Sequence, residues 1–264
     1  MSESESRLII EKENGVGRII FHNPKRHNAM TLDMWKQMPE ALEDFAADDN
    51  VRIVILTGSG ERAFCAGADI SQFEKNRSNE ENQTIYNQAV GIASATLDEM
   101  EKPTLARIKG YCLGGGLGIA LRCDLRIASE DSTFAIPAAK LGIGYGMPGI
   151  KNLNDLVGPA FTKEIFYTGR QFSAEEAYSM GMINRILTAD GLDQYVADYA
   201  ERIGNNAPLT IRSVKLSVYE LTQQERDPDW ARGDQLVKDC LDSDDFIEGR
   251  RAFMEKRKPV FKGK

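Results

Sequence analysis

Short apolar runs bounded by polar residues recur through the first half of the chain, and they predict β-strands. The first two runs flank Glu13-Asn14-Gly15, whose Asn-Gly pair is typical of a tight hairpin turn. The later runs are rich in β-branched residues, as is usual for buried strands. The predicted strands cover residues 8–10, 18–21, 51–57, 104–108 and 125–128.

Helical periodicity alternates with these strands. A helix is expected from Thr31, a typical N-cap, to residue 45, and Pro39 is expected to kink or split it. A second helix is expected near residues 85–100, and from Pro159 onward the pattern is almost wholly helical. This alternation of strands and helices predicts the α/β fold class, as one large domain or a domain with a helical appendage.

The glycine-rich segment KGYCLGGGLG, residues 109–118, lies between a predicted strand and a short predicted helix over 117–122. Because glycine has no side chain, a ligand can approach the main-chain N–H groups at the start of such a helix. The dinucleotide-binding fingerprint is excluded, because its third glycine falls on Ile119. The phosphate-binding loop is excluded as well, because Gly116 and Leu117 stand where it needs Lys and Ser or Thr.

The same segment also has the spacing of a nucleophile elbow, with Cys112 between Gly110 and Gly114. That chemistry needs a histidine base later in the chain, whereas His22 and His27 are the only histidines and both precede Cys112. Cys112 is therefore interpreted as a small packed residue, with the elbow as the weaker alternative.

A second predicted strand leads through small residues into AFCAGADI, residues 63–70. Each of these two turns, taken alone, is explained by tight packing that requires small side chains. Together they could bring two main-chain N–H groups onto one carbonyl oxygen. The pair therefore suggests an oxyanion-binding site.

The segments AFCAGADI and KGYCLGGGLGIALRCDLRIAS resemble the crotonase superfamily, also called the enoyl-CoA hydratase/isomerase family. The resemblance spans nearly the whole chain, from HNPKRHNAM through TGRQFSAEEA to EGRRAFMEKR. It implies a spiral of repeated ββα units over residues 1–200 and a helical region over 201–264 for oligomerisation and coenzyme A contact. It also implies a homotrimer or a dimer of trimers.

The resemblance implies that the N–H groups of Ala68 and Gly115 form an oxyanion hole for the thioester of an acyl-CoA substrate. Coenzyme A would then be part of the substrate, with no permanently bound cofactor and no metal. Residues implied to line the coenzyme A path are Lys25, His27, Ala29, Ala66, Asp69, Ile70, Phe253 and Lys256. The last two lie in the helical region and are expected to act across a subunit boundary, although Lys256 also fits the solvated basic end of a helix.

Hydratases of this family carry two glutamates that this sequence lacks. Gly118 and Ala138 stand at those positions, and the aspartate used by some isomerases would fall at Gly146. Hydration of a double bond requires both an acid and a base. The resemblance to the family therefore does not imply hydratase activity, because these positions lack an acid and a base.

The loop LGIGYGMPGIKNL, residues 141–153, resembles that of methylmalonyl-CoA decarboxylases, which place a tyrosine at the position of Tyr145. Loss of CO₂ from a malonyl-type thioester needs no base, because the breaking C–C bond supplies the electrons of the enolate. It needs an oxyanion hole, an apolar pocket and one donor that orients the carboxylate. Ile136, Ala138 and Met147 are expected to make the pocket apolar, and Tyr145 to orient the carboxylate.

The expected activity is therefore an acyl-CoA lyase of decarboxylase type. One alternative is an enoyl-CoA hydratase/isomerase whose acid and base come from elsewhere, with Asp69 and Glu74 as candidates. Another is a non-catalytic acyl-CoA-binding homologue. An RNA-binding relative is disfavoured, because the first predicted helix carries acidic residues where a basic surface is needed.

The composition agrees with an enzyme that binds a small molecule. Lys and Arg total 33 against 40 Asp and Glu, and the net charge of −7 gives no overall attraction to nucleic acid. No apolar run reaches membrane-spanning length, and the N-terminus has no signal-peptide core, so we expect a cytoplasmic protein. The 4 cysteines show no zinc-binding spacing. The polar segment 74–87 reads as a surface loop, with a lid as the alternative.

Overall fold

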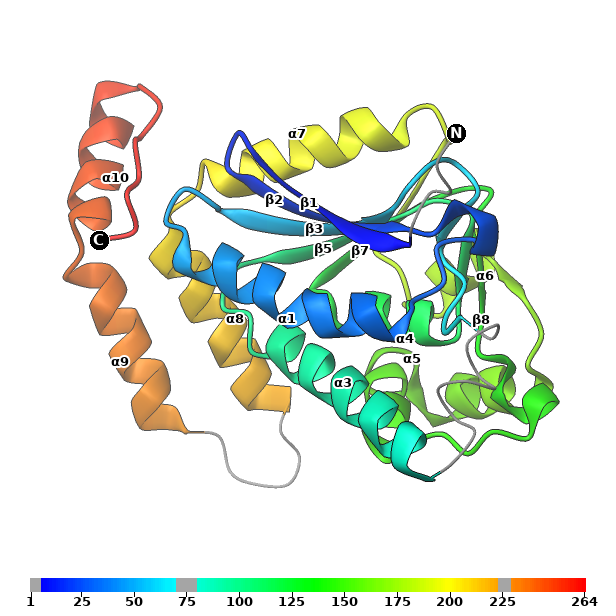
Figure 1. The fold of residues 1–264 in the computed structure, drawn as a ribbon. Coiled ribbons are helices and arrows are strands. Elements are labelled where there is room, and N and C mark those ends of the chain that lie inside the picture. Colours follow the sequence, from blue (N-terminus) through cyan, green and yellow to red (C-terminus); the bar gives the residue numbers. More distant parts are fainter. Residues whose placement is uncertain (1–5, 70–79, 223–228) are drawn as a thin grey trace.

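The computed structural model describes residues 6–69, 80–222 and 229–264, which form two β-sheets surrounded by helices (Figure 1). The larger sheet has the order β1-β2-β3-β5-β7-β10 and the smaller one β4-β6-β8-β9. The strands of the larger sheet are β1 (Arg7–Glu13), β2 (Val16–His22), β3 (Ile53–Gly58), β5 (Thr104–Ile108), β7 (Leu125–Ser129) and β10 (Arg185–Leu187). Those of the smaller sheet are β4 (Ala63–Cys65), β6 (Tyr111–Leu113), β8 (Thr133–Ala135) and β9 (Phe172–Ser173).

From β3 to β8, strands that follow one another along the chain alternate between the two sheets. β3, β5 and β7 pair in parallel in the larger sheet, and β4, β6 and β8 pair in parallel in the smaller one. Helices α3 (Glu80–Asp98), α4 (Gly115–Arg122) and α5 (Met147–Thr168) come after these successive strand pairs. Each turn of the chain thus adds one strand to each sheet and then a helix, which confirms the predicted spiral of ββα units.

The predicted hairpin and all the predicted long strands are present. Glu13 pairs with Val16 across a two-residue turn, in which Asn14 and Gly15 both have positive φ, 51° and 80°. This is the conformation that the Asn-Gly pair favours in right-twisted hairpins. The turn therefore fixes the register of β1 against β2.

Helix α1 (Leu32–Ala47) begins where predicted but is not split. The Thr31 hydroxyl accepts a hydrogen bond from the Met34 N–H at 3.3 Å, as expected for an N-cap. Pro39 lies inside the continuous helix, so the expectation of a split was wrong. Pro39 removes one N–H donor. Buried Met38 before it and buried Leu42 and Phe45 after it hold the helix against the core on both sides of the proline.

The C-terminal part of the chain is mainly helical, but two short strands were missed. β9 and β10 have two and three residues, and their apolar residues gave no strand period long enough to recognise. β4, β6 and β8 were missed for the same reason, since each has three residues. The remaining helices are α6 (Ala174–Ser179), α7 (Leu192–Gly204), α8 (Pro208–Thr222), α9 (Trp230–Leu241) and α10 (Asp244–Glu255), with 3-10 turns η1 (Pro24–Arg26) and η3 (Pro137–Leu141).

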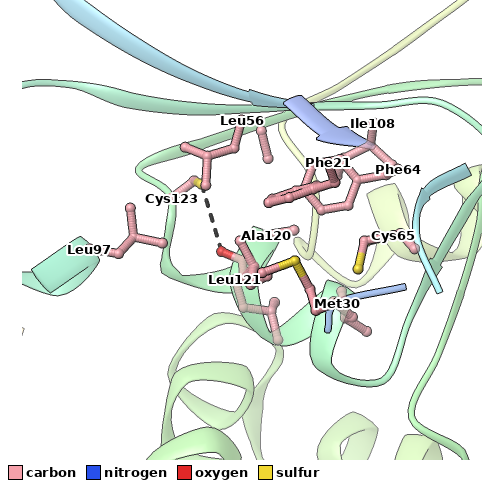
Figure 2. Packing of buried hydrophobic residues seen from close by; sticks show 14 of the residues in the cluster. Phe21, Met30, Leu56, Phe64, Cys65, Leu97, Ile108, Ala120, Leu121 and Cys123 are labelled. Atoms are coloured by element: carbon pink, nitrogen blue, oxygen red, sulfur yellow. Dashed lines mark hydrogen bonds between the residues drawn. The ribbon is translucent and has the colours of Figure 1, made fainter. Parts of the chain in front are cut away.

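The larger sheet is covered on both faces, by α1 and α3 on one side and by α7 on the other (Figure 1). The main core lies between the sheet and helices α1, α3 and α4, and Figure 2 shows Phe21, Phe64, Met30 and Cys65 packed beside α4.

Within the described residues, no helix is long and apolar enough to cross a bilayer, and no group of three or more His, Cys, Asp or Glu side chains could hold a metal ion.

Helix α4 is pressed directly against strand β4. A Cβ atom added to Gly116 would lie 2.2 Å from the Cys65 carbonyl oxygen, far inside van der Waals contact. Only glycine at position 116 allows the helix to approach β4 this closely. The glycine triplet therefore has a packing role in addition to exposing main-chain groups.

Three of the four cysteines lie in the core. Cys65, Cys112 and Cys123 are buried, whereas Cys240 is partly exposed. Burial raises the pKa of Cys65 and of Cys123 to about 12 and that of Cys112 well above its usual value. A thiol with such a pKa is not a nucleophile near neutral pH, so the structure supports the interpretation of Cys112 as a packed residue.

We predict that Gly116→Ala destabilises the protein by about 3 kcal/mol, because the new methyl group overlaps main-chain atoms that cannot move aside. Gly91→Ala is the matched control, since a Cβ at this helical position meets nothing within 4 Å. The control should keep or slightly raise the free energy of unfolding. Urea denaturation of both variants measures this, and equal stabilities would contradict the packing role of Gly116.

We predict that at most one thiol of the native protein reacts rapidly with Ellman's reagent at pH 8, because the three core thiols stay protonated and buried. All four should react in guanidinium chloride. Cys240→Ser should abolish the rapid phase. Rapid labelling of Cys112, identified by peptide mass spectrometry, would contradict the assignment.

Candidate active site

Two segments far apart in the sequence run side by side next to α4. The Ala66 N–H donates to the His27 carbonyl at 3.0 Å, and the Met30 N–H donates to the Gly67 carbonyl at 2.8 Å. The Asp69 N–H donates to the Met30 carbonyl at 3.0 Å. Because Gly67 and Asp69 both bond to Met30, the N–H of the residue between them, Ala68, points away from Met30, as it does along any strand.

The Ala68 N–H lies beside the start of α4. A Cβ atom built on Gly115 would be 3.8 Å from the Ala68 nitrogen, and one built on Gly67 would be 3.2 Å from the Gly115 nitrogen. Gly67 and Gly114 adopt φ angles of 98° and 51°, which side chains disfavour. Within the described ranges, neither the Ala68 N–H nor the Gly115 N–H donates to a protein acceptor. Two open amides therefore lie close together.

The electrostatic field of α4 also favours an anion at this point. Gly115 is the first residue of the helix, where the helix dipole is positive. At the other end, the buried guanidinium of Arg126 donates to the carbonyls of Ala120 and Cys123, and through Nε to the Met182 carbonyl at 2.7 Å. Burial lowers the pKa of Arg126, yet its cation still compensates the negative end of the helix.

Tyr145 lies over the middle of α4, in the turn between η3 and α5. A Cβ atom added to Gly118 would be 3.6 Å from the Tyr145 hydroxyl oxygen. The ring packs edge-on against Phe166, with 4.9 Å between centroids, and closely against Gly149. Burial raises the pKa of the Tyr145 phenol, so it remains a neutral hydrogen-bond donor throughout the physiological range. The hydroxyl thus occupies the space into which a side chain at position 118 would project.

The surroundings of Tyr145 are apolar only in part. Ile136 and Ala138 are buried, with 1% and 7% of their surface exposed, as expected for an apolar pocket. Met147 is 83% exposed, so the expectation that it helps to enclose the pocket was wrong. Met147 is the first residue of α5, and nothing in the sequence showed which way that helix would turn its first residue.

The residues expected along the coenzyme A path fall into two groups. Lys25 is exposed on η1, His27, Ala66 and Asp69 are partly exposed, and Ala29 is buried, with 5% of its surface accessible. These five residues lie on the two paired segments beside Ala68, whereas Ile70, like Glu74, is outside the described residues. Phe253, 82% exposed, and Lys256 lie at the end of α10, on the opposite side of the molecule (Figure 1). Within this chain the structure does not bring them to the site.

Sequence reasoning missed two buried asparagines that hold this region together. The Asn28 amide donates to the Ala63 carbonyl at 2.7 Å and the Ser59 carbonyl at 2.9 Å. The Asn23 amide donates to the Ala29 carbonyl at 2.9 Å and the Asp69 carboxylate at 3.2 Å. Their position before the first helix resembled an ordinary polar loop, and no spacing signal marked them as buried.

The comparisons with known proteins agree on one family. A sequence profile described as "Enoyl-CoA hydratase/isomerase" matches residues 11–264. The short-chain-enoyl-CoA hydratase of Clostridium acetobutylicum is 34% identical over 257 residues, covering 96% of both chains. The carnitinyl-CoA dehydratase of Salmonella typhi is also 34% identical and is covered completely, as is this chain. The crystal structure of an enoyl-CoA hydratase/carnithine racemase from Magnetospirillum magneticum superposes with a TM-score of 0.91, at 33% identity, covering 97% of this chain and 96% of the other. The chain belongs to the enoyl-CoA hydratase/isomerase family, the crotonase superfamily, whose members act on coenzyme A thioesters.

Proposed function

We propose that the chain is an acyl-CoA lyase that forms a thioester enolate held by the N–H groups of Ala68 and Gly115. The observation that carries this proposal is the closeness of these two amides, which have no acceptor in the part of the chain that the structure describes, at the positive end of α4. An enolate places negative charge on the former carbonyl oxygen. A preorganised main-chain donor typically contributes about 3–4 kcal/mol to such a transition state.

Coenzyme A would lie along the paired segments that carry Lys25, His27, Ala29, Ala66 and Asp69, with Ile70 following them. Lys25 is exposed and can meet a phosphate of the nucleotide. Phe253 and Lys256 would complete the coenzyme A site of a neighbouring subunit rather than of their own. Their distance from the site in one protomer supports this arrangement.

The chain would assemble into a homotrimer or a dimer of trimers through its helical region, residues 201–264. Residues 1–200 would form the separate spiral core. α8, α9 and α10 expose large apolar side chains that a solitary protomer would leave in water. These include Val214, Val218, Leu221, Trp230, Val237, Leu241, Ile247 and Phe253.

The chemistry most compatible with the site is decarboxylation of a malonyl-type acyl-CoA. No carboxylate stands at Gly118, Ala138 or Gly146, and the Tyr145 hydroxyl occupies the space beside Gly118. The bond between the α-carbon and the carboxylate would break, CO₂ would leave, and the electron pair would form the enolate. A proton from water then restores the α-carbon. Tyr145 would orient the carboxylate by donating its hydroxyl hydrogen.

Hydration or isomerisation of an enoyl-CoA is the second candidate, because the two sequence relatives described above are named as an enoyl-CoA hydratase and a carnitinyl-CoA dehydratase. Neither of these relatives is named as a decarboxylase, so the first proposal rests on Tyr145, Gly118 and Ala138. The second needs an acid and a base from elsewhere. Asp69 is one candidate, and its carboxylate accepts a hydrogen bond from Asn23 at 3.2 Å. Binding of acyl-CoA without turnover is the third candidate function.

We predict that incubation in D₂O with malonyl-CoA or methylmalonyl-CoA releases CO₂ and yields an acyl-CoA carrying deuterium at the α-carbon. Mass spectrometry of the thioester measures both changes at once. The same panel includes crotonyl-CoA, on which we expect no addition of water. A gain of D₂O by crotonyl-CoA, without CO₂ release from the malonyl esters, would contradict decarboxylation and support the hydratase candidate.

We predict that Tyr145→Phe lowers kcat for decarboxylation by about tenfold to a hundredfold, because one orienting hydrogen bond is lost in the transition state. KM should change little, since coenzyme A supplies most of the binding surface. Tyr195→Phe, on α7 across the sheet, is the matched control and should retain full activity. An unchanged kcat in Tyr145→Phe would exclude Tyr145 from the reaction.

A further inference from the structure

One face of α4 leads away from the two open amides and is partly exposed. Five of the eight residues of this helix are buried, namely Gly116, Leu117, Ile119, Ala120 and Leu121. The other three, Gly115, Gly118 and Arg122, are partly exposed. Their spacing of three and four residues places them on a single face of the helix. This face, which we call the 115–118–122 face, begins at the proposed oxyanion hole.

Arg122 lies at the end of the 115–118–122 face, and only part of its hydrogen-bonding capacity is used. Its side chain is 13% exposed, and its Nη1 forms an ion pair with the Asp98 carboxylate of α3, which is 39% exposed. No other acceptor among the described residues bonds to Arg122, so its Nε and Nη2 donors stay available. A guanidinium can hold a second carboxylate through two parallel hydrogen bonds.

The length of the face suits a short acyl chain. Gly115 and Arg122 are separated by about 10 Å along the helix axis, from a rise of about 1.5 Å per residue. Tyr145 lies between them, with its hydroxyl 3.6 Å from the Cβ position of Gly118. The charge of Arg122 is felt at this hydroxyl, because it opposes the effect of burial on the pKa of Tyr145.

We propose that the acyl chain runs beside the 115–118–122 face, past the Tyr145 hydroxyl that lies over Gly118, and that Arg122 selects acyl-CoA thioesters whose acyl group carries a carboxylate. This inference rests on the proposed function only in placing the thioester oxygen at Ala68 and Gly115. An apolar chain would cover the guanidinium without bonding to its Nε and Nη2 donors, which disfavours such substrates.

The position of Arg122 is also compatible with loss of CO₂. The carboxylate of a malonyl group is two bonds from the thioester carbonyl, so it would lie near Tyr145 rather than against Arg122. A direct ion pair would stabilise the carboxylate and oppose its departure. Arg122 would therefore attract a short anionic acyl group by its charge and would contact a longer one directly.

Binding of a matched pair of unreactive ligands tests this inference. Glutaryl-CoA and valeryl-CoA have the same number of acyl carbons, and the glutaryl carboxylate is not β to the carbonyl, so it cannot leave as CO₂. We expect isothermal titration calorimetry to give a Kd for glutaryl-CoA about tenfold lower than for valeryl-CoA, the size of one charged hydrogen bond. Arg122→Met should abolish this preference without weakening valeryl-CoA, and Arg122→Lys should keep part of it.

The control is Arg185→Met, which removes an exposed arginine on β10 and should leave the preference unchanged. Thermal unfolding shows whether each variant is folded. Equal affinity of the unmodified protein for the two ligands would overturn the inference. A preference that persists in Arg122→Met, or an equal loss for both ligands, would overturn it too. Neither ligand is turned over, so this test does not depend on decarboxylation. If malonyl-CoA released no CO₂ but the Arg122-dependent preference were present, only the decarboxylation proposal would be contradicted.

Discussion

The close contact between α4 and strand β4 is the constraint on which the rest of this structure depends. Gly116 meets the Cys65 carbonyl with no room for a methyl group, and this contact fixes the start of the helix beside the Ala68 amide. The bonds of Met30 to Gly67 and Asp69 turn that amide outward. The buried Arg126 closes the other end of the helix. The spiral core thus holds two main-chain donors side by side without a single functional side chain.

Much of the fold could be predicted from local sequence, and much of the site could not. Apolar runs rich in β-branched residues and the Asn14-Gly15 turn gave five of the six strands of the larger sheet, and only the three-residue β10 was missed. The smaller sheet was missed, since its strands have two or three residues and are stabilised by the spiral rather than by propensity. The glycine-rich turns located the amides, but only the folded chain shows Tyr145 over Gly118, Met147 exposed, and Arg122 on the partly exposed face of α4.

Family membership indicates the class of substrate, whereas the reaction catalysed depends on particular residues of the site. The shared fold and the two amides concern the stabilisation of a thioester enolate, which many reactions of acyl-CoA require. The residues that deliver or remove protons decide which of those reactions follows. At Gly118 and Ala138 this chain has no carboxylate, and the phenol of Tyr145 stands beside the first of these positions. Relatives with the same fold therefore predict the substrate class better than the reaction.

In the proposed complex the N–H groups of Ala68 and Gly115 converge on one thioester oxygen. The most direct measurement is a crystal structure of the complete chain with butyryl-CoA, which carries no carboxylate and is not expected to react. We predict distances of about 2.7–3.1 Å from the thioester oxygen to both nitrogens. A thioester oxygen hydrogen-bonded elsewhere, or to only one of the two amides, would contradict it.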